Sequence, residues 1–136
     1  MPETSSLIRL EHANFPCRSL SVTLKFLQNI FPDWHVRIEG INHEGNKWMH
    51  VGSDQFYMSI TENPKRFEGA SQDGNGIIHV GFVLRDGAAM LERLKKHNIQ
   101  FGMVPAPECK YRIYVFDPEG REIFELIEYN PDYALK

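Results

Sequence analysis

The chain is built from two related halves. When the sequence of 136 residues is slid along itself by 67 positions, residues of the same kind coincide at both ends of each half. The coincident pairs are His12 with His79, Phe15 with Phe82, Arg18 with Arg85, Ser19 with Asp86, Leu24 with Leu91, Leu27 with Leu94, Ile60 with Ile127, Asn63 with Asn130 and Pro64 with Pro131. Loop lengths differ in the middle, where the match is lost. One supersecondary unit therefore occurs twice, and the fold has to pack two copies of it.

Each half is predicted to run strand, helix, strand, strand, strand. Alternating or continuous apolar residues predict strands at 6–15, 34–40, 47–52 and 55–61, and again at 77–84, 99–104, 111–116 and 122–129. Apolar residues at helical spacing predict helices at 19–31 and 87–97, with Ser19 or Ser21 and Asp86 as caps. The polar stretch 62–76 is predicted to be a linker.

These elements define the expected fold. It is α+β, with paired βαβββ modules forming curved mixed sheets around a cleft. The chain is predicted to be a single domain over residues 1–136, with module one at about 6–62, linker 62–76 and module two at about 77–130. The modules pack within one chain or are exchanged between two chains, and we expect a homodimer.

Composition excludes several classes of function. The net charge is −3 without a basic stripe, so neither nucleic acid nor an anionic membrane is an expected partner. No run of 18 apolar residues is present, and the first residues lack the pattern of a secretory signal. Cys17 and Cys109 form no disulfide framework, which is typical of a reduced, cytoplasmic protein.

His79 interrupts the apolar strand "GIIHVGFVLRD". A single histidine in such a strand is most often a hydrogen-bonded core residue. Its recurrence as His12 in the other half instead favours two imidazoles that face a shared cavity and bind a metal. Glu125, between Phe124 and Leu126, is the candidate third ligand, because a buried carboxylate is costly without a cation beside it.

The start "HVGFVLRD" and the end "VFDPEGREIFELIEY" resemble the vicinal oxygen chelate superfamily, which contains glyoxalases, bleomycin resistance proteins and extradiol dioxygenases. The resemblance covers about residues 6–130. It implies sheets that curl into a cleft, where a divalent metal is held by the first and last strands of each unit. His12, His79 and Glu125 match three of these positions.

The fourth ligand position departs from the family pattern. The shift of 67 residues places Met58 opposite Glu125, and a slip of one residue places Ser59 there. Neither is the Glu, Gln or His of a glyoxalase. Family members often carry the carboxylate one position earlier, where this chain has Phe124, so Glu125 requires a bulge or a longer turn. Glu122 is the weaker substitute.

Two histidines and one carboxylate form the ligand set of an iron facial triad. The resemblance therefore implies an enzyme that depends on Fe, Mn, Ni or Zn and acts as a lyase, an isomerase or an oxygenase on a small vicinal-oxygen substrate. The metal would act as a Lewis acid. The catalytic base stays open between Glu62 and Tyr57.

The alternative is a metal-free protein of the same fold that binds a small molecule such as a drug or antibiotic. Aromatic residues that could line its groove are Trp34, Trp48, Phe56, Tyr57, Phe101, Tyr111 and Tyr114. In either case the expected substrate contacts are Tyr57, Met58, Trp48 and Tyr111. A third possibility is a folded relative whose site has been lost.

Overall fold

The structure is a computed structural model that describes residues 8–65 and 79–133. Its strands are β1 (His12–Cys17), β2 (His35–Ile41), β3 (Lys47–Gly52), β4 (Tyr57–Glu62), β5 (Val80–Val83), β6 (Phe101–Met103), β7 (Cys109–Phe116) and β8 (Glu122–Tyr129). The helices are α1 (Leu20–Ile30) and α3 (Gly87–Lys96), followed at the end by a 3-10 turn at Pro131–Tyr133. This order confirms the two βαβββ modules. Most of the predicted linker lies outside the described residues.

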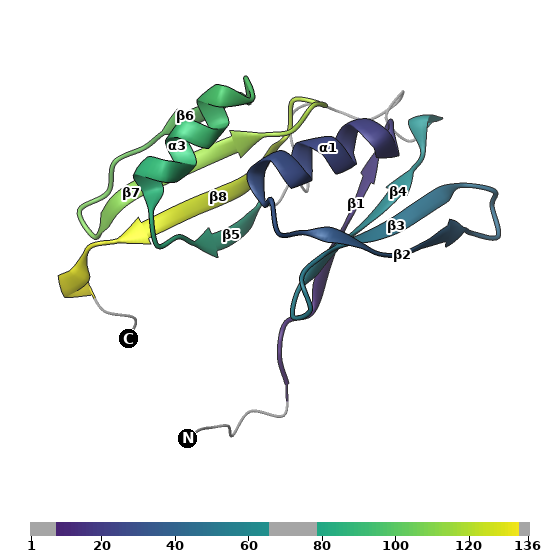
Figure 1. Ribbon diagram of the computed structural model, residues 1–136, viewed down its shortest axis with the longest axis horizontal. Coiled ribbons are helices and arrows are strands. Elements are labelled where there is room, and N and C mark those ends of the chain that lie inside the picture. The colour runs from purple at the N-terminus through teal and green to yellow at the C-terminus, as the bar shows by residue number, and fades with distance from the viewer. Residues whose placement is uncertain (1–7, 66–78, 134–136) are drawn as a thin grey trace.

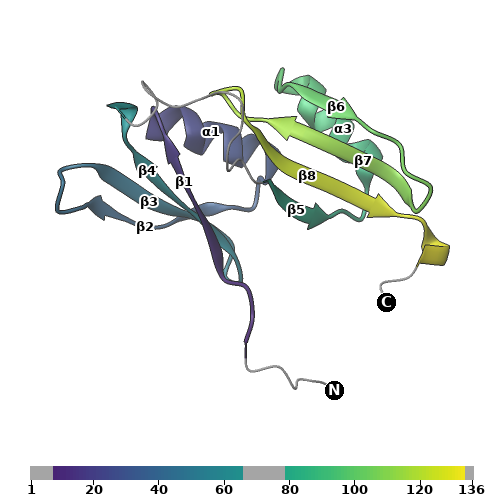
Figure 2. The ribbon, with the colours of Figure 1, turned by 180° about the vertical axis from the view of Figure 1, so that it is seen from behind.

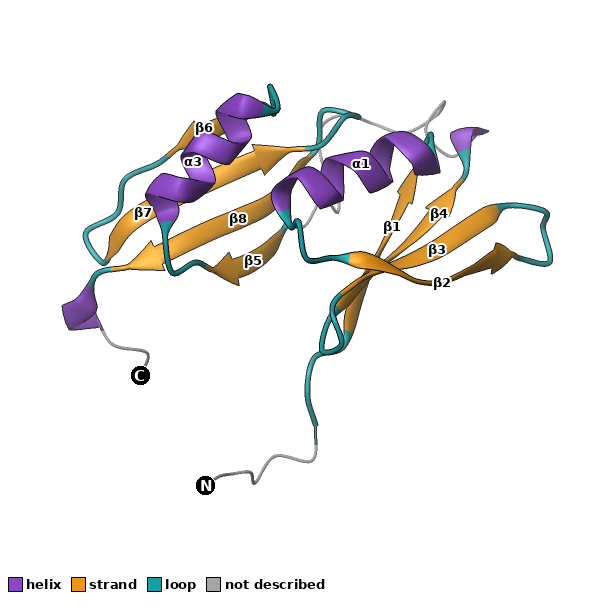
Figure 3. Ribbon diagram, in the orientation of Figure 1, coloured by secondary structure: helices purple, strands orange, loops and turns teal. Residues whose placement is uncertain are grey.

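The two modules have the same sheet topology. The strand orders are β1-β4-β3-β2 and β5-β8-β7-β6, with the first pair of each sheet parallel and the others antiparallel. The predicted mixed sheets are thus confirmed. The sheets lie side by side, with α1 and α3 on the same side of the molecule (Figures 1 and 3). Figure 2 shows the opposite faces, which we call the open faces.

The strand register fixes how the two modules correspond. Ala13 lies opposite Met58, and Val80 lies opposite Phe124. Because Ala13 and Val80 are equivalent, Met58 corresponds to Phe124 and Ser59 corresponds to Glu125. Of the two predicted counterparts of Glu125, the register therefore selects Ser59. The repeat is offset by 67 residues at the first strand and by 66 at the last.

A bulge in β8 explains the late position of Glu125. Val115 lies opposite Phe124, while Phe116 lies opposite Glu122, so Ile123 is the extra residue of β8. Ile123 and Phe124 are both buried, whereas alternation without a bulge would bury only one of them. Of the bulge and the longer turn that the sequence left open, the structure shows the bulge, and Glu125 lies on the open face.

The helix ends follow the predicted chemistry. The Ser19 side chain accepts a hydrogen bond from the Val22 N–H, and the Asp86 side chain accepts one from the Ala89 N–H. Asn98, just past α3, has a φ of 55°, in the left-handed region that ends many helices. Neither described helix is long and apolar enough to cross a membrane.

A carboxylate from the last strand of each module also reaches the start of that module's helix. Glu62 Oε2 accepts from the Leu20 N–H at 2.9 Å, and Glu128 Oε1 accepts from the Gly87 N–H at 2.8 Å. The first helical N–H groups have no partner inside a helix, so these contacts satisfy them. Glu62 therefore serves the helix start, which argues against the predicted role of Glu62 as a base.

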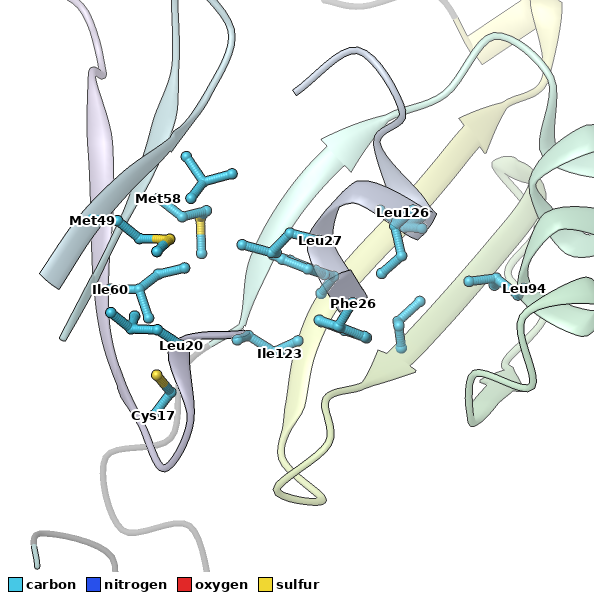
Figure 4. Close-up of a cluster of buried hydrophobic side chains, with 14 of the residues drawn as sticks. Cys17, Leu20, Phe26, Leu27, Met49, Met58, Ile60, Leu94, Ile123 and Leu126 are labelled. Carbon is cyan, nitrogen blue, oxygen red and sulfur yellow. The ribbon is translucent and has the colours of Figure 1, made fainter. Parts of the chain in front are cut away.

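One hydrophobic core joins the modules. Helix α1 places Phe26 and Leu27 against both sheets, as the close-up in Figure 4 shows. Phe26 stacks on Phe124 with ring centroids 6.1 Å apart, and Phe31 meets Phe124 edge-on at 5.5 Å. Phe31 also lies 5.1 Å from Phe82. Aromatic contacts of this kind stabilise a fold beyond the apolar area that they bury. The two modules therefore stabilise one another.

Candidate functional site

Strand alternation places the candidate residues on the open faces. In the first sheet Met49, Val51 and Met58 point to the helices and are buried. Their neighbours along the strands, His50 and Tyr57, consequently point the other way. In the second sheet Phe124 and Leu126 are fully buried on the helix side, which leaves Glu125 on the open face as predicted.

A cluster around Glu125 occupies the open face of the second sheet. His79 Nε2 lies 2.8 Å from Glu125 Oε1, and Arg112 Nε donates to Glu125 Oε2 at 2.9 Å. The Glu125 side chain is only 13% exposed, whereas His79 is 39% exposed. The Tyr114 ring lies edge-on to the imidazole at 5.8 Å, and Glu122 Oε2 is 3.8 Å from His79 Nδ1.

Charge and burial perturb the groups of this cluster. The hydrogen bond with Glu125 is the main cause that raises the pKa of Arg112. Burial, and next the negative charge of Glu125, raise the pKa of Tyr114. Arg112 Cζ also lies 5.3 Å from the centre of the Tyr114 ring. At neutral pH Arg112 is therefore a guanidinium, and the Tyr114 phenol keeps its proton.

Arg112 was not anticipated from the sequence. Strand β8 itself has no cation beside Glu125, but Arg112 reaches it from β7, where it lies opposite Ile127. Tyr114 is the residue of β7 that lies opposite Glu125, and Arg112, two positions earlier, points to the same face. Arg112 can therefore contact Glu125 diagonally across the two strands. The signal was the alternation of "YRIYVF", which places Arg112 and Tyr114 on one face.

A second cluster surrounds His12 on the open face of the first sheet. Glu11 Oε1 lies 3.0 Å from His12 Nδ1 and accepts a hydrogen bond from the Tyr57 hydroxyl at 3.3 Å. The His12 ring stacks on Tyr57 with centroids 4.9 Å apart and an interplanar angle of 14°. The hydrogen bond from His12 is the main cause that lowers the pKa of Glu11.

A row of rings continues from Tyr57 across the sheet. His50 stacks on Tyr57 at 4.4 Å, and Trp48 lies 5.1 Å from His50. Arg37 Cζ lies 4.6 Å from the centre of the Tyr57 ring. Gly40 makes room for this row, since a Cβ there would come within 2.9 Å of the Trp48 ring. Burial is the first cause that lowers the pKa of His50, which favours the neutral imidazole.

The structure brings together two of the three predicted metal ligands. His79 and Glu125 are in contact, while His12 lies in the cluster of the first sheet. Within residues 8–65 and 79–133, no three His, Cys, Asp or Glu side chains come together in a way that could hold a metal ion. Within these residues a single chain therefore brings two of the predicted donors, His79 and Glu125, to one place.

The predicted substrate contacts divide between the two sides of the sheets. Tyr57 and Trp48 belong to the open face, as the ring contacts show. Met58 is 1% exposed and belongs to the core. Tyr111 packs against Gly87 at the start of α3, where even a Cβ would overlap its ring. Met58 and Tyr111 are therefore on the helix side, away from both clusters.

The donor set fits a divalent metal in its chemistry. Imidazole and carboxylate are ligands that Fe, Mn, Ni and Zn accept. His79 Nε2 and a Glu125 oxygen already meet, and the Glu125 side chain is largely withdrawn from solvent. Arg112 holds the other carboxylate oxygen, so a metal would share Glu125 with a guanidinium.

Paired βαβββ modules of identical strand order define the vicinal oxygen chelate fold. A family model described as "Glyoxalase/Bleomycin resistance protein/Dioxygenase superfamily" matches residues 9–123, and the chain belongs to this superfamily. Comparison with curated protein sequences gave no significant match.

Solved structures show the same fold at low sequence identity. The fosfomycin resistance protein FosX of Listeria monocytogenes is 20% identical with a TM-score of 0.73, covering 96% of this chain and 100% of that one. A FosX structure complexed with Mn(II) and sulfate is 23% identical with a TM-score of 0.68, over the same shares of the chains. A domain of the superfamily from Frankia sp. EAN1pec is 18% identical with a TM-score of 0.73, covering 93% and 95%.

Proposed function

We propose that the protein is a divalent-metal-dependent enzyme acting on a small molecule with adjacent oxygen atoms. The metal would be held by His79 and Glu125 of one chain together with His12 of a second copy. The observation that carries this proposal is the contact of 2.8 Å between His79 Nε2 and Glu125 Oε1 on the open face of the second sheet.

The second copy is invoked because His12 belongs to the other sheet of the chain. If two chains pack open face to open face, the first sheet of one copy meets the second sheet of the other, and a two-fold axis creates two identical sites. Each open face carries charges of both signs, with Arg37 and Glu11 on the first sheet and Arg112, Glu122 and Glu125 on the second. Each face also exposes an apolar side chain, Ile38 at 55% and Val83 at 63%.

The residues of the chain have distinct roles in this proposal. When bound, the metal supplies Lewis acidity to the two substrate oxygens. Arg112 orients Glu125 and balances its charge, and Tyr114 closes the cluster on the side of His79. Trp48 offers a ring surface for the carbon skeleton of the substrate, whereas Tyr57 is 8% exposed and its ring is covered by His12, His50 and Arg37. Burial and the nearby Glu11 raise the pKa of Tyr57, so its phenol is a hydrogen-bond donor near neutral pH and a poor base.

Metal content is the direct test. Protein purified without a chelator or a histidine tag is analysed for metal before and after incubation with Mn(II), Fe(II), Ni(II) or Zn(II). Mn(II) is the first choice because a FosX structure holds it. We expect about one ion per chain. His79→Ala, Glu125→Gln and His12→Ala should each reduce it, while His43→Ala, in the exposed turn after β2, serves as the matched control.

The metal-free binding protein is the second candidate, and the Arg112 contact favours it. A guanidinium already balances the charge of Glu125, so the carboxylate does not require a metal. A wild-type chain that takes up none of the four metals, yet binds a small molecule through Trp48 and Tyr57, would replace the enzyme proposal with this one.

A further inference from the structure

We propose that Glu11 is a positioning residue for His12. The Glu11 carboxylate selects the neutral tautomer of His12 that carries its proton on Nδ1 and its lone pair on Nε2. The consequence for metal binding rests on the function proposed above. The tautomer can be measured in the metal-free chain. The positioning role of Glu11 and the metal-binding role of His12 can therefore be contradicted independently.

The hydrogen bond fixes which nitrogen carries the proton. A carboxylate only accepts, so the contact of 3.0 Å between Glu11 Oε1 and His12 Nδ1 requires a proton on Nδ1. In the neutral imidazole the lone pair then resides on Nε2. Carboxylates that orient metal-binding histidines in this way raise the basicity of the ligand and hold its ring in place.

Tyr57 fixes both partners. Its hydroxyl donates to the same Glu11 oxygen at 3.3 Å, and its ring lies nearly parallel to the His12 ring. Its backbone N–H also donates to the Glu11 carbonyl at 3.1 Å, so β4 anchors Glu11 by main chain and side chain. His50 and Arg37 in turn pack on the Tyr57 ring. The His12 ring is thus held by one hydrogen bond and one stacked surface.

The other half of the repeat lacks this device. The residue that precedes His79 is Ile78, so no carboxylate stands at the position equivalent to Glu11. His79 instead contacts Glu125 through Nε2, the nitrogen that His12 leaves free. The shortest carboxylate contact of His79 is therefore at Nε2, with Glu122 Oε2 at 3.8 Å from its Nδ1, whereas that of His12 is at Nδ1 and comes from its preceding residue.

The tautomer can be read by nitrogen NMR of the ring in the metal-free chain, at about pH 8, above the ordinary pKa of an imidazole. We expect His12 to carry its proton on Nδ1 in the wild type. Glu11→Ala should move the population toward the Nε2–H form. Glu11→Gln keeps an acceptor oxygen and should largely retain the wild-type form. Glu44→Ala, in the exposed β2–β3 turn, is the control. An unchanged His12 tautomer in Glu11→Ala overturns the inference.

Metal titration of the same variants supplies the second readout. Glu11→Ala should weaken Mn(II) binding by about 10- to 100-fold, and the double variant with His12→Ala should bind no more weakly than His12→Ala alone. If Glu11→Ala shifts the tautomer and leaves Mn(II) affinity unchanged, the positioning role stands and His12 is not a ligand. Additive losses in the double variant would overturn the role of Glu11 in metal binding.

Discussion

Arg112 and Glu125 are joined across strands β7 and β8 by a hydrogen bond of 2.9 Å between Nε and Oε2. This contact pairs the preferred candidate carboxylate of the second sheet with a cation. A metal that binds the other oxygen therefore encounters a positive charge nearby, which weakens its affinity. The pair also gives the Glu125 side chain, at 13% exposure, a hydrogen-bond partner within the chain itself.

Replacing Arg112 with Gln separates these effects. Without metal, Glu125 loses its main partner, and the free energy of unfolding should fall by about 1–3 kcal/mol. With Mn(II) present, the ion should take over the charge of Arg112, and the loss should largely disappear. Urea unfolding with and without Mn(II) measures both values. A loss that is the same in both conditions would contradict the idea that a metal binds beside Glu125.

Phe124 tests the common core. Phe124→Ala removes a fully buried ring that contacts Phe26, Phe31 and Phe82, so we expect a loss of about 3–5 kcal/mol. Because these contacts join both modules, thermal unfolding should remain one transition at a lower temperature. Ile41→Ala, at a residue that is 67% exposed, is the control and should change stability by less than about 0.5 kcal/mol. Two separate transitions would show that the modules fold independently.

The helix starts offer a matched pair of variants. Glu62→Ala and Glu128→Ala each remove an acceptor from the first N–H of a helix, and each should cost about 1 kcal/mol. Glu44→Ala should cost nothing measurable. If Glu62 has only this structural role, Glu62→Gln should keep its metal-dependent turnover. A loss of turnover in a stably folded Glu62→Gln would restore Glu62 as the base.

Cys17 should resist alkylation. Burial raises the pKa of its thiol to about 11, above the ordinary value of 9.0. A raised pKa leaves less thiolate at a given pH, so at pH 8 the reactive fraction falls roughly 100-fold. Burial also raises the pKa of Cys109, though that residue is only partly buried. We expect Ellman's reagent to modify Cys17 only on unfolding, and rapid modification of native Cys17 would contradict its burial.

The repeat made much of the fold predictable. Period-two and helical patterns recur in both halves, so the sequence of helices and strands in each module and the caps at Ser19 and Asp86 followed from local sequence. A bulge before Glu125 was one of two expected explanations, the other being a longer turn. The register itself depends on pairing between strands distant in sequence, so Met58 and Ser59 remained equal candidates until the structure paired Met58 with Ala13.

The site was less predictable because its contacts run between strands. Arg112 reaches Glu125 diagonally from another strand, and nothing local to β8 announces it. Tyr111 was expected at the substrate, but a register irregularity of β7 between Cys109 and Tyr111 accompanies its packing against Gly87. The separation of His12 from Glu125 within one chain depends on how whole sheets pack, which the residue pattern does not encode.

Mixing two defective variants tests the shared site most directly. His12→Ala and Glu125→Gln chains are coexpressed, and the Mn(II) content of the purified mixture is measured against each variant alone. If each site takes His12 from one copy and Glu125 from the other, every mixed dimer contains one site with all three ligands. Random pairing then restores about a quarter of the wild-type metal content. If the coexpressed mixture binds no more Mn(II) than the average of the two variants, the ligands do not come from two copies, and the proposed site is contradicted.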